Sequence, residues 1–148
     1  MNARTILVPL DFSDVTPRVI EVAKEMAQAF GGSLVLLHVA EPEPDFVGFE
    51  PGPQPVRMSV ARDFRAEHQR LEELKSEFAA AGLQVTALQI QGATVEKILH
   101  AAEQHGAGLI VMGSHGHGAL YELLVGSVTH GVMKGAHCPV VVVPSASK

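Results

Sequence analysis

Several residue types and patterns are scarce in this sequence of 148 residues, and each scarcity excludes a class of protein. There is no tryptophan, one tyrosine and one cysteine, Cys138, so a framework of disulfide bonds is excluded. No apolar run approaches the roughly 20 residues of a membrane span, and no basic-then-apolar leader stands at the N-terminus. We therefore expect a cytoplasmic protein without a membrane partner.

Positive charge is also scarce. The 11 Lys and Arg residues face 16 Asp and Glu residues, which gives a formal net charge of −5, and the positive residues are scattered along the chain. Proteins that bind duplex nucleic acid gather their positive residues into a patch or stripe. We therefore expect no nucleic-acid partner.

What the sequence does contain is a regular alternation of strand-like and helix-like segments. Short apolar runs predict buried strands, and amphipathic stretches between them predict helices, with caps at Thr16, Thr94 and Ser127. The predicted strands are residues 5–10, 33–39, 83–90, 109–112 and 138–144. The predicted helices cover residues 16–30, about 62–81, from 94 to about 105, and about 119–134. The position of Gly126 and Ser127 within the last of these predicts that this helix either begins near Gly126 or is irregular in its N-terminal portion. This alternation predicts an α/β fold, an open five-stranded parallel sheet with helices on both faces, flavodoxin- or Rossmann-like, with strand order 3-2-1-4-5.

One segment interrupts the alternation. Residues 41–56 hold five prolines and two glycines, which excludes an ordinary helix or central strand there. We expect a proline-rich loop at about residues 41–60, either a lid or a plain linker, within one domain that spans residues 1–148. A chain of this length buries roughly two-thirds of its unfolded surface, which suffices for one core.

Two loops at the carboxyl edge of the predicted sheet contain the candidate functional residues. Asp11 and Ser13 follow the first strand, and "GSHGHG" at residues 113–118 follows the fourth. Asp11 is a candidate ligand-binding carboxylate with the capping of the following turn as the alternative, and Ser13 is expected to be a turn or capping residue. Ligands in open parallel sheets bind where the strand order reverses, which here is between these two strands. Because glycines let backbone N–H groups approach a ligand, the second loop suits a phosphate, although a plain glycine turn is the alternative.

Standard enzyme motifs are absent. "GSHGHG" does not match G-x-G-x-x-G, no G-x-x-x-x-G-K-[ST] occurs, and Ser114 lies in M-G-S-H-G rather than in G-x-S-x-G. These absences count against a dinucleotide enzyme, a P-loop ATPase and an esterase.

Four motifs in order resemble the universal stress protein family. They are "ILVPLDFSD", "LVLLHV", "HCPVVVVP" and the pattern G-x2-G-x9-G-[ST], which Gly113, Gly116, Gly126 and Ser127 satisfy. The likeness runs from residue 4 to residue 144 apart from the proline-rich loop. The glycine pattern resembles that of the ATP-binding subgroup of the family.

The resemblance implies that ATP binds between the first and fourth strands. Pro9, Leu10 and Asp11 would line the adenine and ribose, with the Asp11 carboxylate accepting bonds from ribose hydroxyls or adenine. Val39 would contact adenine. The ribose and phosphates would lie against Met112, Gly113 and Gly116, and the phosphate chain against Gly126, Ser127 and Val128.

The resemblance also implies partners and ligand alternatives. A homodimer formed through the C-terminal strand is expected, as is an unidentified protein partner. Tyr121 and Glu122 stand where relatives often carry a basic residue, so AMP and ADP remain alternatives to ATP. Mg²⁺ is a candidate for neutralising the phosphates.

Three functions follow as hypotheses. The first is a nucleotide-dependent regulatory module for stress response, the second a slow ATP hydrolase or phosphotransferase, and the third a nucleotide-free structural dimer. Hydrolysis needs a base and a group that neutralises charge, whereas Asp11 is already assigned to the ribose and a P-loop lysine is absent. We favour binding over catalysis and assign no catalytic residue.

The remaining polar residues are interpreted as structural. His115 and His117 without an obvious third ligand predict no metal site. His38 lies inside the second strand and is expected to be a core or edge histidine with a satisfied hydrogen bond. Cys138 is expected to be a buried structural thiol.

Overall fold

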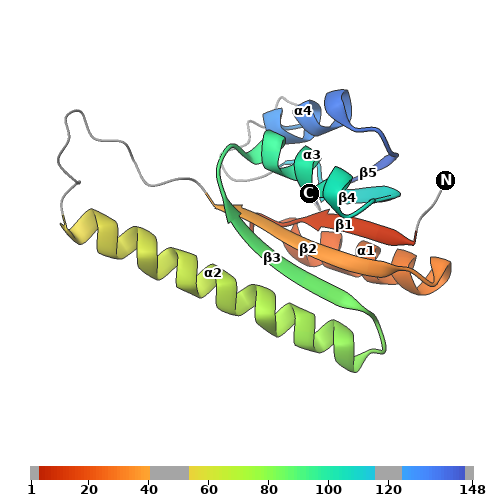
Figure 1. The fold of residues 1–148 in the computed structure, drawn as a ribbon, viewed down its shortest axis with the longest axis horizontal. Helices are drawn as coiled ribbons and strands as arrows, with labels where there is room; N and C mark the ends of the chain where they lie inside the picture. The colour runs from red at the N-terminus through yellow and green to blue at the C-terminus, as the bar shows by residue number, and fades with distance from the viewer. Residues whose placement is uncertain (1–3, 41–53, 116–124, 146–148) are drawn as a thin grey trace.

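A five-stranded parallel sheet with two helices on each face forms the core of the protein (Figure 1). The structure is a computed structural model and describes residues 4–40, 54–115 and 125–145. The elements are β1 (Thr5–Pro9), α1 (Thr16–Phe30), β2 (Ser33–Ala40), α2 (Gln54–Ala80), β3 (Val85–Gln91), α3 (Thr94–Gln104), β4 (Leu109–Gly113), α4 (Ser127–Gly135) and β5 (Val140–Val143). The strand order β3-β2-β1-β4-β5 confirms the predicted fold and topology.

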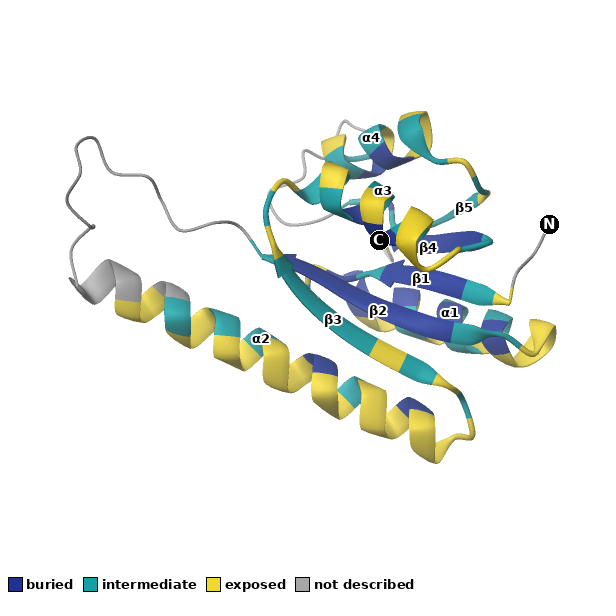
Figure 2. Ribbon diagram, viewed as in Figure 1, coloured by how far each residue is buried: buried dark blue, intermediate teal, exposed yellow. Residues whose placement is uncertain are grey.

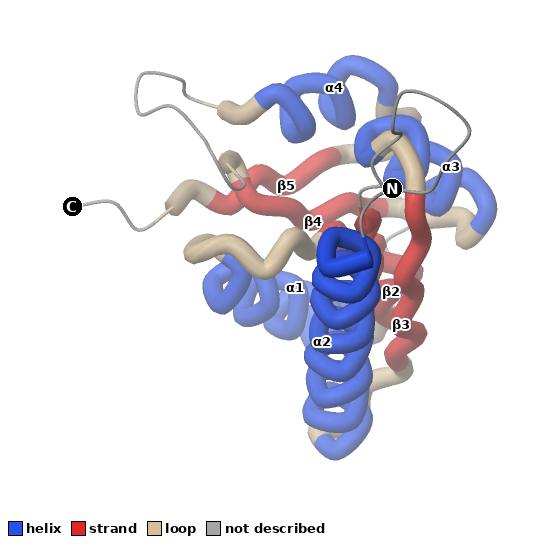
Figure 3. The backbone as a smooth tube through the Cα atoms, turned by 90° about the vertical axis from the view of Figure 1, so that its left-hand side faces the viewer, coloured by secondary structure: helices blue, strands red, loops and turns tan. Residues whose placement is uncertain are grey.

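The two faces of the sheet have separate apolar cores, because successive residues of a strand point to opposite faces. On one face, Ile6, Val8 and Leu36 pack against α1 and α2. On the other, Leu7 and Leu37 pack against α3 and α4. Figure 3 shows α1 and α2 on one side of the sheet and α3 and α4 on the other.

Burial on both faces explains the continuous apolar runs of the central strands. Three or more successive residues are fully buried in β1, β2 and β4, whereas the edge strand β3 is only partly buried (Figure 2). The outer side of α2 is exposed along most of its described length. No helix in residues 4–40, 54–115 and 125–145 is long and apolar enough to cross a membrane.

Helix α2 begins earlier than the sequence predicts. The prediction placed residues up to about 60 in the proline-rich loop, but α2 spans Gln54–Ala80, 27 residues. Pro55 is the second residue of this helix, and a proline in the first turn displaces no intrahelical hydrogen bond because the first N–H groups have no partner in the helix. Composition alone therefore placed the end of the loop too late.

Three predicted helix caps are each wrong by one position. Thr16, Thr94 and Ser127 are the first residues of their helices, so the residues before them take the cap positions. In the case of α4, the cap is Gly126 in an extended conformation with φ −74° and ψ 169°. Helix α4 therefore begins at Ser127, which confirms the predicted alternative of a helix that begins near Gly126, and residues 116–124 lie outside the described part of the chain.

Candidate functional site

The loops after β1 and β4 are neighbours at the carboxyl edge of the sheet. β1 pairs in parallel with both β2 and β4, so the strand order reverses at β1. Val15, at the end of the first loop, lies directly against the backbone of Gly113 at the end of β4. This is the place where open parallel sheets bind their ligands.

The two described ends of the glycine loop are joined by backbone hydrogen bonds. The Gly126 N–H donates to the Ser114 carbonyl at 2.7 Å, and the Ser114 N–H donates to the carbonyl of Val143 in β5 at 2.8 Å. Gly113 and Gly126 are thus brought close together, as the resemblance to the universal stress protein family implies. Gly116, the third glycine of the pattern, lies outside the described residues, as do His117, Tyr121 and Glu122.

Gly113 and Gly126 differ in what a side chain would meet. A Cβ on Gly113 would lie 2.5 Å from Val15 Cγ1, so close packing between β4 and the β1 loop requires a glycine there. A Cβ on Gly126 would meet described neighbours no closer than the Ser114 carbonyl oxygen at 3.5 Å, an ordinary contact. The φ of −74° at Gly126 is open to any residue, so the described part of the protein gives no internal reason for a glycine there.

The first turn of α4 begins directly beside the end of β4. The His130 N–H donates to the Gly126 carbonyl at 2.9 Å, which is the first hydrogen bond of the helix. The hydroxyl of Thr129 donates to the carbonyl of Gly113 at 2.7 Å and fixes the helix to the strand. Because no side chain caps this helix in the structure described, the N–H groups of Ser127 and Val128 head the positive end of the helix dipole.

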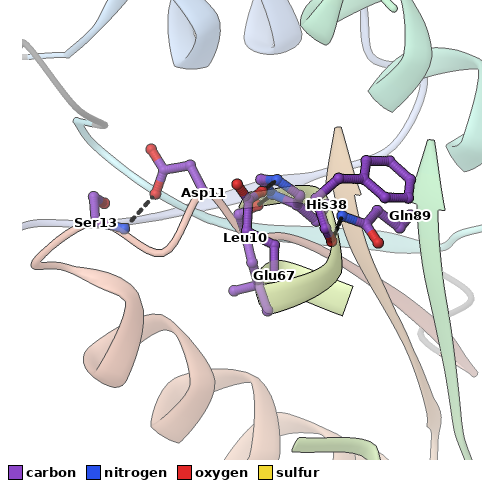
Figure 4. A network of polar contacts seen from close by, with 7 residues as sticks. Leu10, Asp11, Ser13, His38, Glu67 and Gln89 are labelled. Carbon is purple, nitrogen blue, oxygen red and sulfur yellow. Dashed lines mark hydrogen bonds and ion pairs between the residues drawn. The ribbon is translucent and has the colours of Figure 1, made fainter. Parts of the chain in front are cut away.

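The loop after β1 is a tight turn around Asp11. The Ser13 N–H donates to Asp11 Oδ1 at 2.9 Å, an Asx turn that orients the carboxylate. The next residue, Phe12, has a φ of 59°, which is uncommon for a residue with a Cβ. Asp11 is itself exposed and stands at the edge of the sheet facing solvent (Figure 4).

Side chains from β2 and α2 surround this loop. His38 of β2 is 6% exposed, and its Nδ1 lies 2.7 Å from the Leu10 carbonyl oxygen, which confirms the expected buried histidine with a hydrogen bond at one ring nitrogen; Nε2 has no hydrogen-bond partner among the described residues. Its Nε2 contacts the carboxylate of Glu67 in α2 (Figure 4). The guanidinium carbon of Arg70 lies 4.4 Å from the centroid of the Phe12 ring. Glu67 and Arg70 were not predicted as site residues, because both belong to a charged helix face typical of solvent exposure.

The other predicted site residues divide between the two faces of the sheet. Leu10 is buried in the core beneath α1 and α2, and its N–H donates to Leu37 at 2.8 Å. Val39, Met112 and Val128 belong to the core beneath α3 and α4. Pro9, the last residue of β1, is partly buried.

Among the described residues, His115 and Cys138 were considered in the sequence for metal binding or thiol chemistry. Within residues 4–40, 54–115 and 125–145, no three His, Cys, Asp or Glu side chains are grouped so that they could hold a metal ion. Nδ1 of His115 lies 3.0 Å from the Ser114 hydroxyl oxygen. Cys138 is a free thiol that is only partly buried, so the prediction of a buried thiol is wrong in its degree of burial, and this partial burial raises the pKa of the thiol.

Comparison with known proteins identifies the family. The model of the universal stress protein family matches residues 2–144. The chain belongs to the universal stress protein family. The resemblance noted in the sequence is thereby confirmed at the level of the family.

Individual universal stress proteins are similar along nearly the whole chain. The Thermus aquaticus "Universal stress protein in QAH/OAS sulfhydrylase 3'region" is 40% identical over 143 residues, covering 95% of this chain and 98% of that protein. Universal stress protein MJ0577 of Methanocaldococcus jannaschii is 31% identical over 153 residues, covering 95% of this chain and 94% of that protein. The solved structure of MJ0577 has a TM-score of 0.84 at 26% identity, covering 100% of both chains.

Two further solved universal stress proteins contain a nucleotide. One, in complex with cAMP, has a TM-score of 0.66 at 22% identity and covers 99% of this chain and 100% of that chain. The other, from Archaeoglobus fulgidus in complex with dAMP, has a TM-score of 0.64 at 21% identity and covers 96% of this chain and 98% of that chain. These two likenesses show the shared fold.

Proposed function

We propose that this universal stress protein binds an adenine nucleotide, ATP in the first place, at the carboxyl ends of β1 and β4, and acts as a nucleotide-dependent regulatory module in stress response. The main support for this proposal is the glycine at position 126. Neither its φ nor its described neighbours require a glycine, yet it caps a helix whose first N–H groups have no side-chain cap in the described structure. A glycine needed for the approach of a ligand accounts for both observations.

The residues around this glycine fit the parts of a nucleotide. The N–H groups of Gly126, Ser127 and Val128 and the Ser127 hydroxyl are proposed to hold the phosphates, together with Gly113 and Gly116 and with Mg²⁺ as a counter-ion. The Asp11 carboxylate, at the other loop, is proposed to accept hydrogen bonds from the ribose or adenine. Pro9, Leu10, Val39 and Met112 complete the proposed adenine and ribose side.

The relatives support an adenine nucleotide as the ligand class. Universal stress proteins of this fold have been solved in complex with cAMP and with dAMP, which both carry adenine and one phosphate. The glycine pattern of this chain, which resembles the ATP-binding subgroup, extends the proposal to ATP, with AMP and ADP as the alternatives. We further propose a homodimer formed through β5, since β5 is an edge strand of four valines that pairs with β4 on one side.

The proposal is tested by nucleotide binding to the wild type and to a variant at Gly126, where the fold is expected to tolerate a side chain. Isothermal titration of the protein with ATP, ADP and AMP in the presence of Mg²⁺ should show binding, and mass spectrometry of the denatured protein should reveal any nucleotide retained in purification. Gly126→Val should weaken ATP binding at least about tenfold, because the side chain displaces phosphate from charge-assisted N–H contacts. Its melting temperature should stay close to that of the wild type, since the described neighbours leave room.

Two results would contradict the proposal. One is a wild-type protein without affinity for any of the three nucleotides at millimolar concentration. The other is a Gly126→Val variant that binds ATP as tightly as the wild type. Rapid release of ADP from Mg-ATP would instead favour the hydrolase.

A further inference from the structure

His38 connects the proposed nucleotide loop to helix α2. The side chain is buried at the carboxyl end of β2, and Nδ1 lies 2.7 Å from the Leu10 carbonyl oxygen. A carbonyl oxygen only accepts hydrogen bonds, so Nδ1 must carry a hydrogen and act as the donor. This contact fixes the tautomer of His38.

The second ring nitrogen, Nε2, is buried and makes no hydrogen bond among the described residues, although it contacts the Glu67 carboxylate. With a hydrogen on Nδ1, a neutral ring presents a lone pair at Nε2, and this lone pair faces a carboxylate oxygen of Glu67. Two acceptors do not bond, so a hydrogen bond between His38 and Glu67 requires a proton on one of the two groups. The register neighbour of His38 in β3 is Gln89, which is uncharged and donates its amide to the carbonyl of Phe64 in α2 at 2.9 Å.

Phe12 connects the same histidine to the other side of Asp11. The Phe12 ring centroid lies 5.1 Å from that of His38, with an interplanar angle of 44°, and the Arg70 guanidinium lies over the same ring. The left-handed backbone of Phe12 costs free energy, so these ring contacts must compensate for it. The residues before and after Asp11 therefore both contact His38, Leu10 through its carbonyl oxygen (Figure 4) and Phe12 through its ring.

We propose that His38 is a positioning residue for the nucleotide: it fixes the Asp11 carboxylate through the Leu10 carbonyl and the Phe12 ring, and Glu67 of α2 holds His38 in place through the proton between them. This inference rests on the proposed function. Through this arrangement, a change in the position of α2 changes the affinity of the protein for the ribose, and binding of the ribose in turn favours one position of α2. Nothing in α2 needs to touch the nucleotide for this coupling.

Two ligands, one with and one without ribose hydroxyls, distinguish the positioning of Asp11 by His38 from a general structural role of His38. His38→Leu should weaken the binding of ATP about tenfold, because the carbonyl of Leu10 loses its partner and the loop loses its support. The same variant should weaken the binding of 2′,3′-dideoxy-ATP by less than about twofold, since this ligand has no ribose hydroxyl for Asp11 to accept from. His38→Asn, whose amide reproduces the Nδ1 donor, should recover most of the lost ATP affinity.

Matched controls lie on the exposed face of α2. His68 and Glu72 form a similar pair 4.0 Å apart, with side chains 58% and 48% exposed, one turn from each other. His68→Leu and Glu72→Gln should bind both ligands as the wild type does. Equal losses for ATP and dideoxy-ATP in His38→Leu, or no loss for either, would overturn the positioning role while leaving nucleotide binding intact.

A spectroscopic measurement tests the shared proton without any nucleotide. In ¹⁵N spectra of the ring, both nitrogens of His38 should show a bound or shared proton, whereas Glu67→Gln should convert Nε2 into an acceptor of the glutamine amide. The amide signals of Asp11 and Phe12 should shift in His38→Leu and not in His68→Leu. An unprotonated Nε2 in the wild type overturns the shared proton. A wild-type protein that binds no nucleotide overturns the proposed function and the positioning role together.

Discussion

The two loops that meet at the carboxyl edge of the sheet are held in different ways. The loop after β1 is held by side chains. Asp11 Oδ1 accepts a hydrogen bond from the Ser13 N–H, and His38 contacts the Leu10 carbonyl oxygen and the Phe12 ring. The loop after β4 is held at its described ends mainly by backbone, through the bonds from Ser114 to Val143 and from Gly126 to Ser114.

The difference fits the two halves of a nucleotide. Phosphate oxygens are recognised by backbone N–H groups, which glycines expose without the need for any particular side chain. A ribose hydroxyl needs a carboxylate at a defined place, and a side chain on a loop is placed only as well as its supports allow. Substitutions in the β4 loop should therefore act through steric contact, and those around the β1 loop through lost support.

The largest effect on stability is expected at Gly113, where the two loops touch. Gly113→Val should lower the free energy of unfolding by about 2–3 kcal/mol, because even a Cβ would lie 2.5 Å from Val15 Cγ1 and valine is too stiff at χ1 to move away. Urea denaturation monitored by circular dichroism measures this loss. Gly126→Val is the matched control with little expected change, and an equal loss in both variants would erase the contrast between these two glycines.

The contrast between Gly113 and Gly126 also marks the limit of the sequence. The apolar runs predicted the sheet, its order and its two-sided core, because strands buried on both faces have few alternatives to a doubly covered parallel sheet. The family resemblance implied that the glycines lie near each other. The sequence did not distinguish Gly113, where a side chain would meet Val15, from Gly126, where a Cβ would make only ordinary contacts with the described residues, because a glycine occupies both positions.

The Thr129 hydroxyl is the next contact to remove, because among the described residues it adds a side-chain bond to the β4 loop. Thr129→Val keeps the shape but leaves the Gly113 carbonyl without this donor, 2.7 Å away in the native protein. We expect a loss of about 1–2 kcal/mol in the free energy of unfolding, the usual cost of a buried group left without its partner. Thr86→Val, at an exposed position of β3, is the control. No measurable loss would mean that backbone bonds alone hold this loop.

The residues of α2 that support the β1 loop could not be predicted from the sequence, for a different reason. Glu67 and Arg70 reach His38 and Phe12 because α2 packs along β2 and β3, with Leu71 and Phe78 buried in the core. The neighbours that Leu71 and Phe78 bring to the sheet edge depend on the crossing angle, which tertiary packing decides.

The smallest effect is expected for the Arg70 guanidinium over the Phe12 ring. Arg70 is exposed, so solvent screens its attraction to the ring, and a coupling of about 0.5 kcal/mol is expected. A double-mutant cycle of Arg70→Gln and Phe12→Leu, measured by urea denaturation, isolates this coupling from the loss of each side chain alone. The same cycle with Arg65, also exposed in α2, in place of Arg70 should give no coupling. A zero coupling for Arg70 as well would leave His38 as the support of the Phe12 ring and would place the whole link between α2 and the loop on the pair of His38 and Glu67.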